Sequence, residues 1–223
     1  MTWVAIILLG GIVALDATSF PQVMVSRPLV AGTLTGLIIG YPVQGFVIGA
    51  ALEAFGLSVL PFGAARYPEA GTAVVAATMA WHAAEGSGVP GGPGILLLAL
   101  LFALGWERLG GWTITAMRRW NEHLVATTLP LGVGALERRH LLALTLDYLR
   151  GAVLTGAGAL IGWPILTLAG SHWGLANGTT AGALRAVVAL MLGAALTVFG
   201  GWTERRLPFV VGIAVGAAVV LLT

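Results

Sequence analysis

Long apolar stretches alternate with short polar breaks along the whole chain. The apolar segments fall at about 3–15, 29–40, 43–60, 72–84, 94–117, 141–169, 181–202 and 207–223. A helix that crosses a bilayer needs about 20 apolar residues, and the last four segments are long and poor in internal charge. The pattern predicts an all-α, polytopic integral membrane protein.

The N-terminal half is interrupted more often than the C-terminal half. Gly40-Tyr41-Pro42 divides one apolar run, and its first piece would be only about 18 Å long as a helix. Breaks rich in Gly and Pro follow at 61–68 and 87–94. Such interrupted pieces point to the binding site of a transporter. We therefore expect one membrane domain over 1–223, with broken or re-entrant helices over 1–93 and regular spans over 94–223. Ordinary loops between tilted helices would give the same breaks.

The first apolar segment is short for a membrane span. Residues 3–15 would extend about 20 Å as a helix, against a hydrocarbon core of about 30 Å. The segment also lacks the basic leading region of a cleaved signal peptide. We expect it either to tilt into the interface or to continue past Asp16 into a space lined by protein.

Composition supports the membrane assignment. Of the 223 residues, 58% are hydrophobic and 9% are charged, whereas soluble domains carry about 25% charged residues. All basic residues are Arg, and several form doublets between apolar segments, at 118–119, 138–139 and 205–206. The positive-inside rule places these doublets in the cytoplasm. Doublets so placed do not form a phosphate-binding stripe, so we expect no nucleic-acid partner.

Glycines recur at intervals of four residues within the apolar segments. They are Gly32, Gly36 and Gly40, then the pairs Gly45 and Gly49, Gly178 and Gly182, and Gly212 and Gly216. A helix face without side chains lets another backbone approach closely. The spacing predicts tight helix packing, within the subunit or against a partner.

Charged residues in the apolar first half are the candidates for function, because intramembrane charges are costly and need a compensating role. Glu53 ends an apolar run and is the strongest of them, since a buried carboxylate accepts hydrogen bonds from sugar hydroxyl groups. Alternatively, Glu53 forms a structural ion pair with Arg27 or Arg66.

Two further stretches combine polar side chains with a break. Asp16 and Gln22 lie in a polar stretch that fits a binding loop and equally fits a capped turn at the interface. Glu69 has the same ambiguity, because it could cap the N-terminus of a helix that begins near Ala70.

The sequence carries no signature of catalysis or of a bound cofactor. It contains no Cys, no Gly-x-Ser-x-Gly elbow and no phosphate-binding loop. His82 and Glu85 share a helix face, but a third metal ligand is not evident. We therefore expect no catalytic residue, no metal site and no cofactor.

Several motifs in the first 80 residues resemble one transporter family. They are Arg27-Pro28-Leu29-Val30, the run Thr33 to Gly40, Gly45 to Gly49, Leu52-Glu53, Gly63-Ala64-Ala65 and Pro68-Glu69. Together they resemble the IIC subunit of the mannose–fructose–sorbose family. These subunits belong to the bacterial phosphoenolpyruvate-dependent sugar phosphotransferase system.

The resemblance implies a multi-pass permease subunit of the bacterial inner membrane that binds and translocates a hexose-type sugar. It implies a IID membrane partner, cytoplasmic IIA and IIB phosphoryl carriers, and a homo-oligomer of IIC–IID units. Phosphorylation would occur on IIB, so this chain would not itself be an enzyme. The residues expected along the sugar path are Asp16, Gln22, Arg27, Glu53 and Glu69. Two alternatives are an ion-coupled secondary transporter, with protons carried by Asp16 and Glu53, and a non-transporting scaffold or sensor with the same fold.

Overall fold

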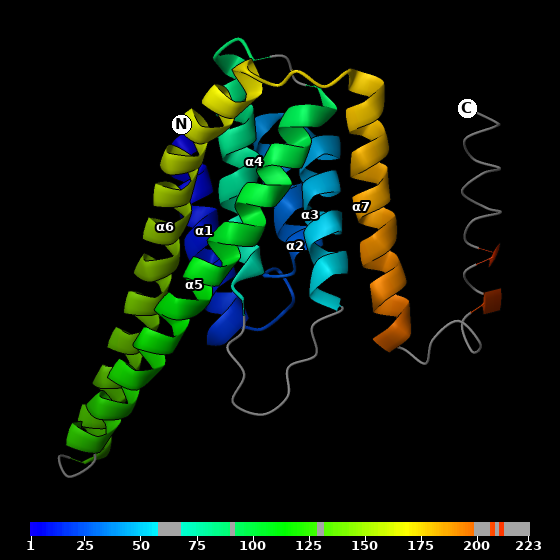
Figure 1. Cartoon of the computed structure of the whole chain (residues 1–223). Helices are drawn as coiled ribbons and strands as arrows, with labels where there is room; N and C mark the ends of the chain where they lie inside the picture. Colours follow the sequence, from blue (N-terminus) through cyan, green and yellow to red (C-terminus); the bar gives the residue numbers. More distant parts are fainter. Residues whose placement is uncertain (58–67, 90–91, 129–131, 199–205, 208–209, 212–223) are drawn as a thin grey trace.

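The computed structural model describes residues 1–57, 68–89, 92–128, 132–198, 206–207 and 210–211. Seven helices of 12 to 39 residues make up most of this part of the chain. They are α1 (Thr2–Thr18), α2 (Pro28–Ile39), α3 (Pro42–Leu57), α4 (Ala70–Gly86), α5 (Pro93–Thr128), α6 (Val133–Ser171) and α7 (Asn177–Val198). Successive helices run in opposite directions through the bundle (Figure 1). The predicted all-α membrane fold is confirmed.

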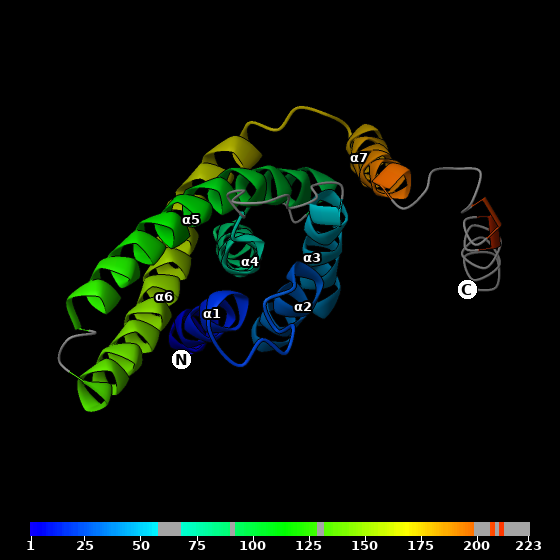
Figure 2. The ribbon, with the colours of Figure 1, turned by 90° about the horizontal axis from the view of Figure 1, so that it is seen from below.

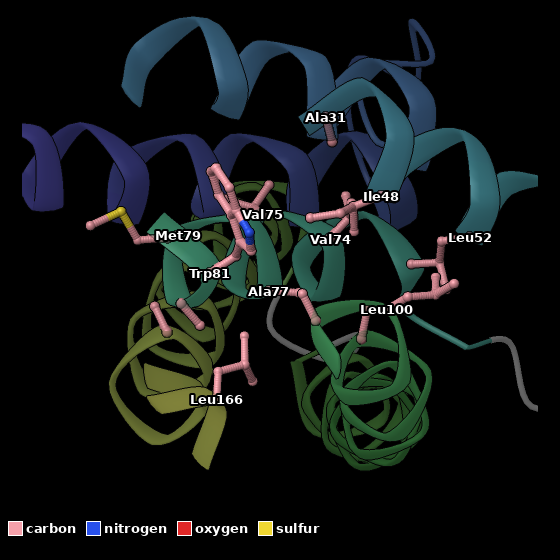
Figure 3. Close-up of a cluster of buried hydrophobic side chains, with 14 of the residues drawn as sticks. Ala31, Ile48, Leu52, Val74, Val75, Ala77, Met79, Trp81, Leu100 and Leu166 are labelled. Atoms are coloured by element: carbon pink, nitrogen blue, oxygen red, sulfur yellow. The ribbon is translucent and has the colours of Figure 1, made fainter. Parts of the chain in front are cut away.

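Helix α4 lies at the centre of the bundle. Figure 2 shows α1, α2, α3, α5 and α6 arranged around it. Twelve of its 17 residues are buried, and most of these are small, which lets neighbouring helices approach closely. Its larger side chains pack against residues from the surrounding helices, among them Ile48, Leu52, Leu100 and Leu166 (Figure 3).

Helices α2 and α3 form the broken element expected from the sequence. Pro28 lies in the first turn of α2, where its missing N–H costs nothing, and Gly40 ends that helix in the left-handed region at φ 83°. Pro42 then begins α3. With 12 residues, α2 is about 18 Å long, so the hairpin turns back at Tyr41 and re-enters the bundle. The predicted break is confirmed, and we call α2 and α3 the re-entrant hairpin.

Glycines allow α2 and α3 to pack closely against each other in this hairpin. A Cβ atom at Gly32 would lie 2.5 Å from the Gly45 carbonyl oxygen, and one at Gly36 would lie 2.6 Å from the Tyr41 carbonyl oxygen. The predicted close packing is therefore found between α2 and α3. Gly40 serves as the helix cap and makes no such contact.

The glycine pairs of the C-terminal half behave differently. Gly178 and Gly182 are exposed on α7, and a Cβ atom at either position would meet no described residue within 4 Å. Of the two kinds of packing expected, the described part of the subunit supplies none at these glycines, and packing against a partner stays a prediction. Gly212 and Gly216 lie outside the described residues.

Helices α5 and α6 are longer than the sequence pattern predicted. The apolar segments end at 117 and resume at 141, but α5 continues to Thr128 and α6 begins at Val133. Arg is a good helix former, and no Gly or Pro interrupts 113–128 or 135–150, so the polar Arg doublets extend the helices. Within the described residues, these two helices are long and apolar enough to cross a membrane, whereas α1 and α2 are shorter apolar helices.

The α5–α6 hairpin extends beyond the rest of the bundle at one end, which we call the basic end because it carries Arg118, Arg119, Arg138 and Arg139. The Glu69 N–H, at the start of α4, donates to the Glu107 carbonyl oxygen at 3.0 Å. Helix α5 therefore continues about 30 Å past the level where α4 begins. The chain leaves α1 and enters α2 at this same end of the bundle (Figure 1).

Candidate functional site

Arg27 and Glu53 form an ion pair across the open end of the α2–α3 hairpin. The Arg27 Nη2 atom lies 2.7 Å from Glu53 Oε1, with the two side chains 53% and 15% exposed. The Leu29 N–H also donates to Glu53 Oε2 at 3.3 Å, at the positive end of α2. Of the two ion pairs considered from the sequence, the one with Arg27 is formed. Arg66 lies outside the described residues.

Asp16 organises the loop between α1 and α2. Helix α1 continues past it, and Asp16 is 2% exposed, so the first apolar segment does extend into a space lined by protein. The Asp16 carboxylate accepts the N–H groups of Val23 at 2.6 Å and Ser26 at 2.8 Å. The structure thus gives Asp16 the role of a capped turn, one of the two alternatives left open by the sequence.

Gln22 is exposed and lies in the middle of this loop. Its backbone has φ 61°, and Met24 also has a positive φ of 68°. Non-glycine residues rarely adopt this region, and when they do they cluster at functional loops. The loop ends at Arg27, so Asp16 and Gln22 belong to the segment that positions the Arg27–Glu53 pair.

Glu69 binds Arg150 of α6. Its two carboxylate oxygens lie 2.5 Å and 3.0 Å from the two terminal guanidinium nitrogens, and the side chains are 1% and 11% exposed. Glu69 occupies the N-cap position of α4, but its side chain makes no capping hydrogen bond. Glu69 thus takes the N-cap position considered from the sequence, but its carboxylate does not cap the helix, because a bidentate guanidinium is a stronger partner for a buried carboxylate than a backbone N–H.

Asp147 extends this contact into a network over four segments. Its carboxylate accepts Arg150 Nε at 2.9 Å and the Ser19 hydroxyl at 2.7 Å, and it also accepts the Thr18 hydroxyl. Arg150 further donates to Thr113 of α5 at 2.9 Å. We call Glu69, Asp147 and Arg150 the buried charge network. It ties the end of α1, the start of α4, α5 and α6 together.

Asp147, Arg150 and Glu107 were not among the site residues expected from the sequence. Asp147 and Arg150 are spaced i, i+3 in an apolar segment, and that spacing is the signal that could have identified them. Glu107 is 2% exposed in α5 and lies 3.4 Å from Arg108. A single carboxylate inside an apolar span was its only signal in the sequence.

The Arg27–Glu53 pair and the buried charge network both lie toward the basic end of the bundle. A Cβ atom at Gly71, in the first turn of α4, would overlap the Ser26 carbonyl oxygen, so the loop before Arg27 packs directly on the start of α4. The pair and the network differ in exposure to solvent, since Arg27 is half exposed whereas Glu69 is buried. Of the five sequence candidates, Gln22, Arg27 and Glu53 are at least partly exposed, whereas Asp16 and Glu69 are buried. No group of three His, Cys, Asp or Glu residues suited to a metal occurs in the described part of the chain.

Comparisons with known proteins agree with this architecture. A solved structure described as "Structure of membrane protein" superposes with a TM-score of 0.70 at 21% sequence identity, covering 99% of this chain and 92% of that one. At this identity the likeness concerns the fold. No curated protein sequence matches the chain. A family model described as "PTS system sorbose-specific iic component" matches residues 1–154.

The match covers more than half of the chain, including α1 to α5 and the buried charge network. It agrees with the resemblance found in the residues around Arg27 and Glu53, and it makes the protein a membrane-embedded permease component. The chain belongs to the sorbose-specific IIC family of the sugar phosphotransferase system.

Proposed function

We propose that the chain binds a hexose-type sugar in the membrane and passes it to the cytoplasm, where a IIB partner phosphorylates it. A IID subunit supplies the other half of the permease, and IIA recharges IIB. The assembly is a homo-oligomer of IIC–IID units in the bacterial inner membrane, with the basic end of this chain in the cytoplasm. Gln22, Arg27 and Glu53 border the sugar path, and the buried Asp16 and Glu69 hold the segments around it in place.

The observation that carries this proposal is the accessible Arg27–Glu53 pair at the open end of a re-entrant hairpin. The pair offers fixed donors and acceptors, which suit neutral hydroxyl groups. Short broken helices at membrane depth are also where transporters bind their substrates. The pair lies toward the basic end, which the positive-inside rule places on the cytoplasmic side. That is the side on which a cytoplasmic phosphoryl carrier would meet the sugar.

Uptake measurements test the proposal. The chain is co-expressed with its IID, IIA and IIB partners, and uptake of radiolabelled mannose, fructose and sorbose is followed. Glu53→Gln removes the charge and keeps the size of the side chain, and it is expected to abolish uptake of the transported sugar. Glu122→Gln, at an exposed position on the protruding part of α5, is the matched control. Normal uptake by Glu53→Gln would show that Glu53 does not bind the sugar.

The energy source separates this function from an ion-coupled transporter. Uptake by the proposed permease requires phosphoenolpyruvate and yields sugar phosphate inside the cell. Uptake that follows a proton gradient in the absence of phosphoenolpyruvate would contradict the proposal.

A further inference from the structure

Four polar side chains form a stripe on one face of α4, toward the end of the bundle opposite the basic end. Thr78, Trp81, His82 and Glu85 are spaced i, i+3, i+4 and i+7, which places them on one helix face. Each has a buried polar atom without a hydrogen-bond partner among the residues that the structure describes. These atoms are Thr78 Oγ1, Trp81 Nε1, His82 Nδ1 and Glu85 Oε2. We call these four residues the α4 polar stripe.

The stripe faces the re-entrant hairpin. Val74, one turn earlier on the same side of α4, lies 3.1 Å from the Cβ position of Gly32 in α2. Tyr41, at the tip of the hairpin, has its ring 5.3 Å from Trp81 in an edge contact and 5.3 Å from His82. Figure 3 shows the Trp81 ring on the side of α4 away from Leu166 of α6.

The stripe also extends past the tip of the hairpin. Tyr41 is level with Trp81 and His82, and Glu85 lies about 4.5 Å further along the helix axis. His82 and Glu85 are partly exposed, whereas Thr78 and Trp81 are fully buried. The polar atoms thus run from an accessible end of α4 inward to the tip of the hairpin.

Four buried polar atoms without hydrogen-bond partners on one helix face destabilise the folded protein. A buried donor or acceptor that lacks a partner costs about 1–3 kcal/mol, and buried polar groups in folded proteins normally bind protein, water or ligand. The stripe combines donors on Thr78 and Trp81, an acceptor on Glu85 and aromatic surfaces on Trp81 and Tyr41. A few convergent polar groups in an aromatic setting are typical of a small-molecule site. This set suits a neutral ligand that carries both hydroxyl groups and apolar C–H faces.

We propose that the α4 polar stripe and Tyr41 form an entry subsite for sugar, separate from the Arg27–Glu53 pair. This inference rests on the proposed transport function. The two places lie at opposite ends of α2, which is about 18 Å long. Sugar arriving from outside the cell binds the stripe first and then passes the tip of the hairpin toward Arg27 and Glu53.

Vesicles of opposite orientation test the subsite. In right-side-out vesicles, Trp81→Phe and Glu85→Gln are each expected to raise the KM for external sugar about five- to tenfold, the range for one lost hydrogen bond. Inside-out vesicles supplied with phosphoenolpyruvate and the phosphoryl carriers present sugar from the other side, and there the same variants should phosphorylate it with the wild-type KM. Trp163→Phe is the matched control, because the Trp163 N–H has a partner in the Ser87 hydroxyl at 2.9 Å.

An unchanged KM in right-side-out vesicles would overturn the subsite. An equal loss in both orientations would overturn it as well, because it would show general damage. If the wild-type complex transported none of the sugars tested, the proposed function itself would fail.

A second measurement does not depend on transport. The chain contains no Cys, so Glu85→Cys provides one label site, and Leu175→Cys provides an exposed control. Millimolar mannose, fructose or sorbose should slow maleimide labelling at position 85 and leave labelling at position 175 unchanged. Labelling at position 85 that no sugar slows would overturn the subsite. Labelling blocked by the IID subunit regardless of sugar would also overturn it, because the stripe would then be a subunit interface.

Discussion

Arg150 of α6 binds Glu69 at the start of α4 through both terminal guanidinium nitrogens, at 2.5 Å and 3.0 Å. The contact joins residues 81 positions apart in the sequence, and both side chains are shielded from solvent. Since Asp147 holds the third nitrogen of the same guanidinium, the orientation of Arg150 is fixed from two sides.

Removal of one charge from this contact should destabilise the protein strongly. Glu69→Gln leaves Arg150 with one carboxylate in place of two, and loss of one partner of a buried ion pair costs about 3–5 kcal/mol. We expect a lower melting temperature for the purified protein in detergent and an even larger loss for Arg150→Met, which leaves two carboxylates unpaired. Glu122→Gln, on the exposed part of α5, should melt like wild type. Equal melting of Glu69→Gln and wild type would show that the contact does not stabilise the fold.

A charge exchange distinguishes a structural ion pair from a sugar contact at Arg27 and Glu53. Arg27→Glu combined with Glu53→Arg keeps one charge of each sign at the open end of the hairpin. If the pair only joins α2 to α3, the exchange should restore the folding yield and the uptake that each single variant loses. We expect the yield to recover and uptake to stay absent, because the positions of donor and acceptor relative to the sugar are reversed. Full recovery of uptake would assign the pair a purely structural role.

A methyl group at Gly32 should prevent close packing of the hairpin. In Gly32→Ala the new Cβ atom would lie 2.5 Å from the Gly45 carbonyl oxygen, so α2 and α3 must separate. We expect a large loss of folded protein, measured as the monodisperse fraction in size-exclusion chromatography. Gly178→Ala is the matched control, since its Cβ atom meets nothing within 4 Å and Ala favours the helix by up to about 1 kcal/mol. A wild-type yield for Gly32→Ala would mean that the two arms can separate without cost.

Substitution of Gly40 tests backbone strain at a position where a new side chain meets no steric clash. Its φ is 83° and a Cβ atom there would have open space, so Gly40→Ala should cost about 1–2 kcal/mol through the left-handed conformation alone. Gly40→Asn should cost less, because Asn tolerates that region. Melting temperatures in detergent measure both effects. The order of stability is expected to be wild type, then Asn, then Ala, and the reverse order of the two variants would contradict this explanation.

Single cysteines in this Cys-free chain test the orientation in the membrane. Glu122→Cys, on the basic end, and Val23→Cys, in the loop after α1, should react with an impermeant maleimide only when the cytoplasmic face is open to it. Leu175→Cys, between α6 and α7, should react from outside the cell. Val23 and Leu175 are both exposed in the structure. Labelling of Val23→Cys and Leu175→Cys from the same side would contradict the alternating order of the helices.

Helix breaks were the most predictable part of the fold. The left-handed Gly40 and the prolines that begin α2, α3 and α5 act through local backbone geometry, so their effect is visible in the sequence. The glycine spacing correctly indicated close packing of α2 on α3. On α7 the same spacing meets no described helix, because spacing alone does not say which helix, or which partner, covers a face. The apolar pattern did not show that α5 and α6 continue through their Arg doublets, since charge marks the end of the apolar region and does not end a helix.

Pairing of charges was the least predictable part of the candidate site. The sequence identified Glu53 and Arg27 as costly charges and left their partnership open, and for Glu69 it left open whether the residue caps α4 or lies on the sugar path. Arg150 lies on a helix far along the chain, and nothing in the sequence near Glu69 indicates that the two meet. The α4 polar stripe was equally unpredictable, because nothing in the sequence distinguishes Thr78 and Trp81. Only the structure shows that their polar atoms are buried and unpaired.

The sequence by itself determined that the protein is a helical membrane protein, where most of its helices break and which family it belongs to. Hydropathy, proline and glycine act over one or two turns, and a family motif is read directly from the residues. The tertiary structure alone decided that α4 is central, that Arg150 holds Glu69 and that Asp16 folds the loop before Arg27. It also decided which polar groups are left without partners. These outcomes depend on which helix faces meet, and the free energy of a buried charge is set by partners that the chain brings together only when it folds.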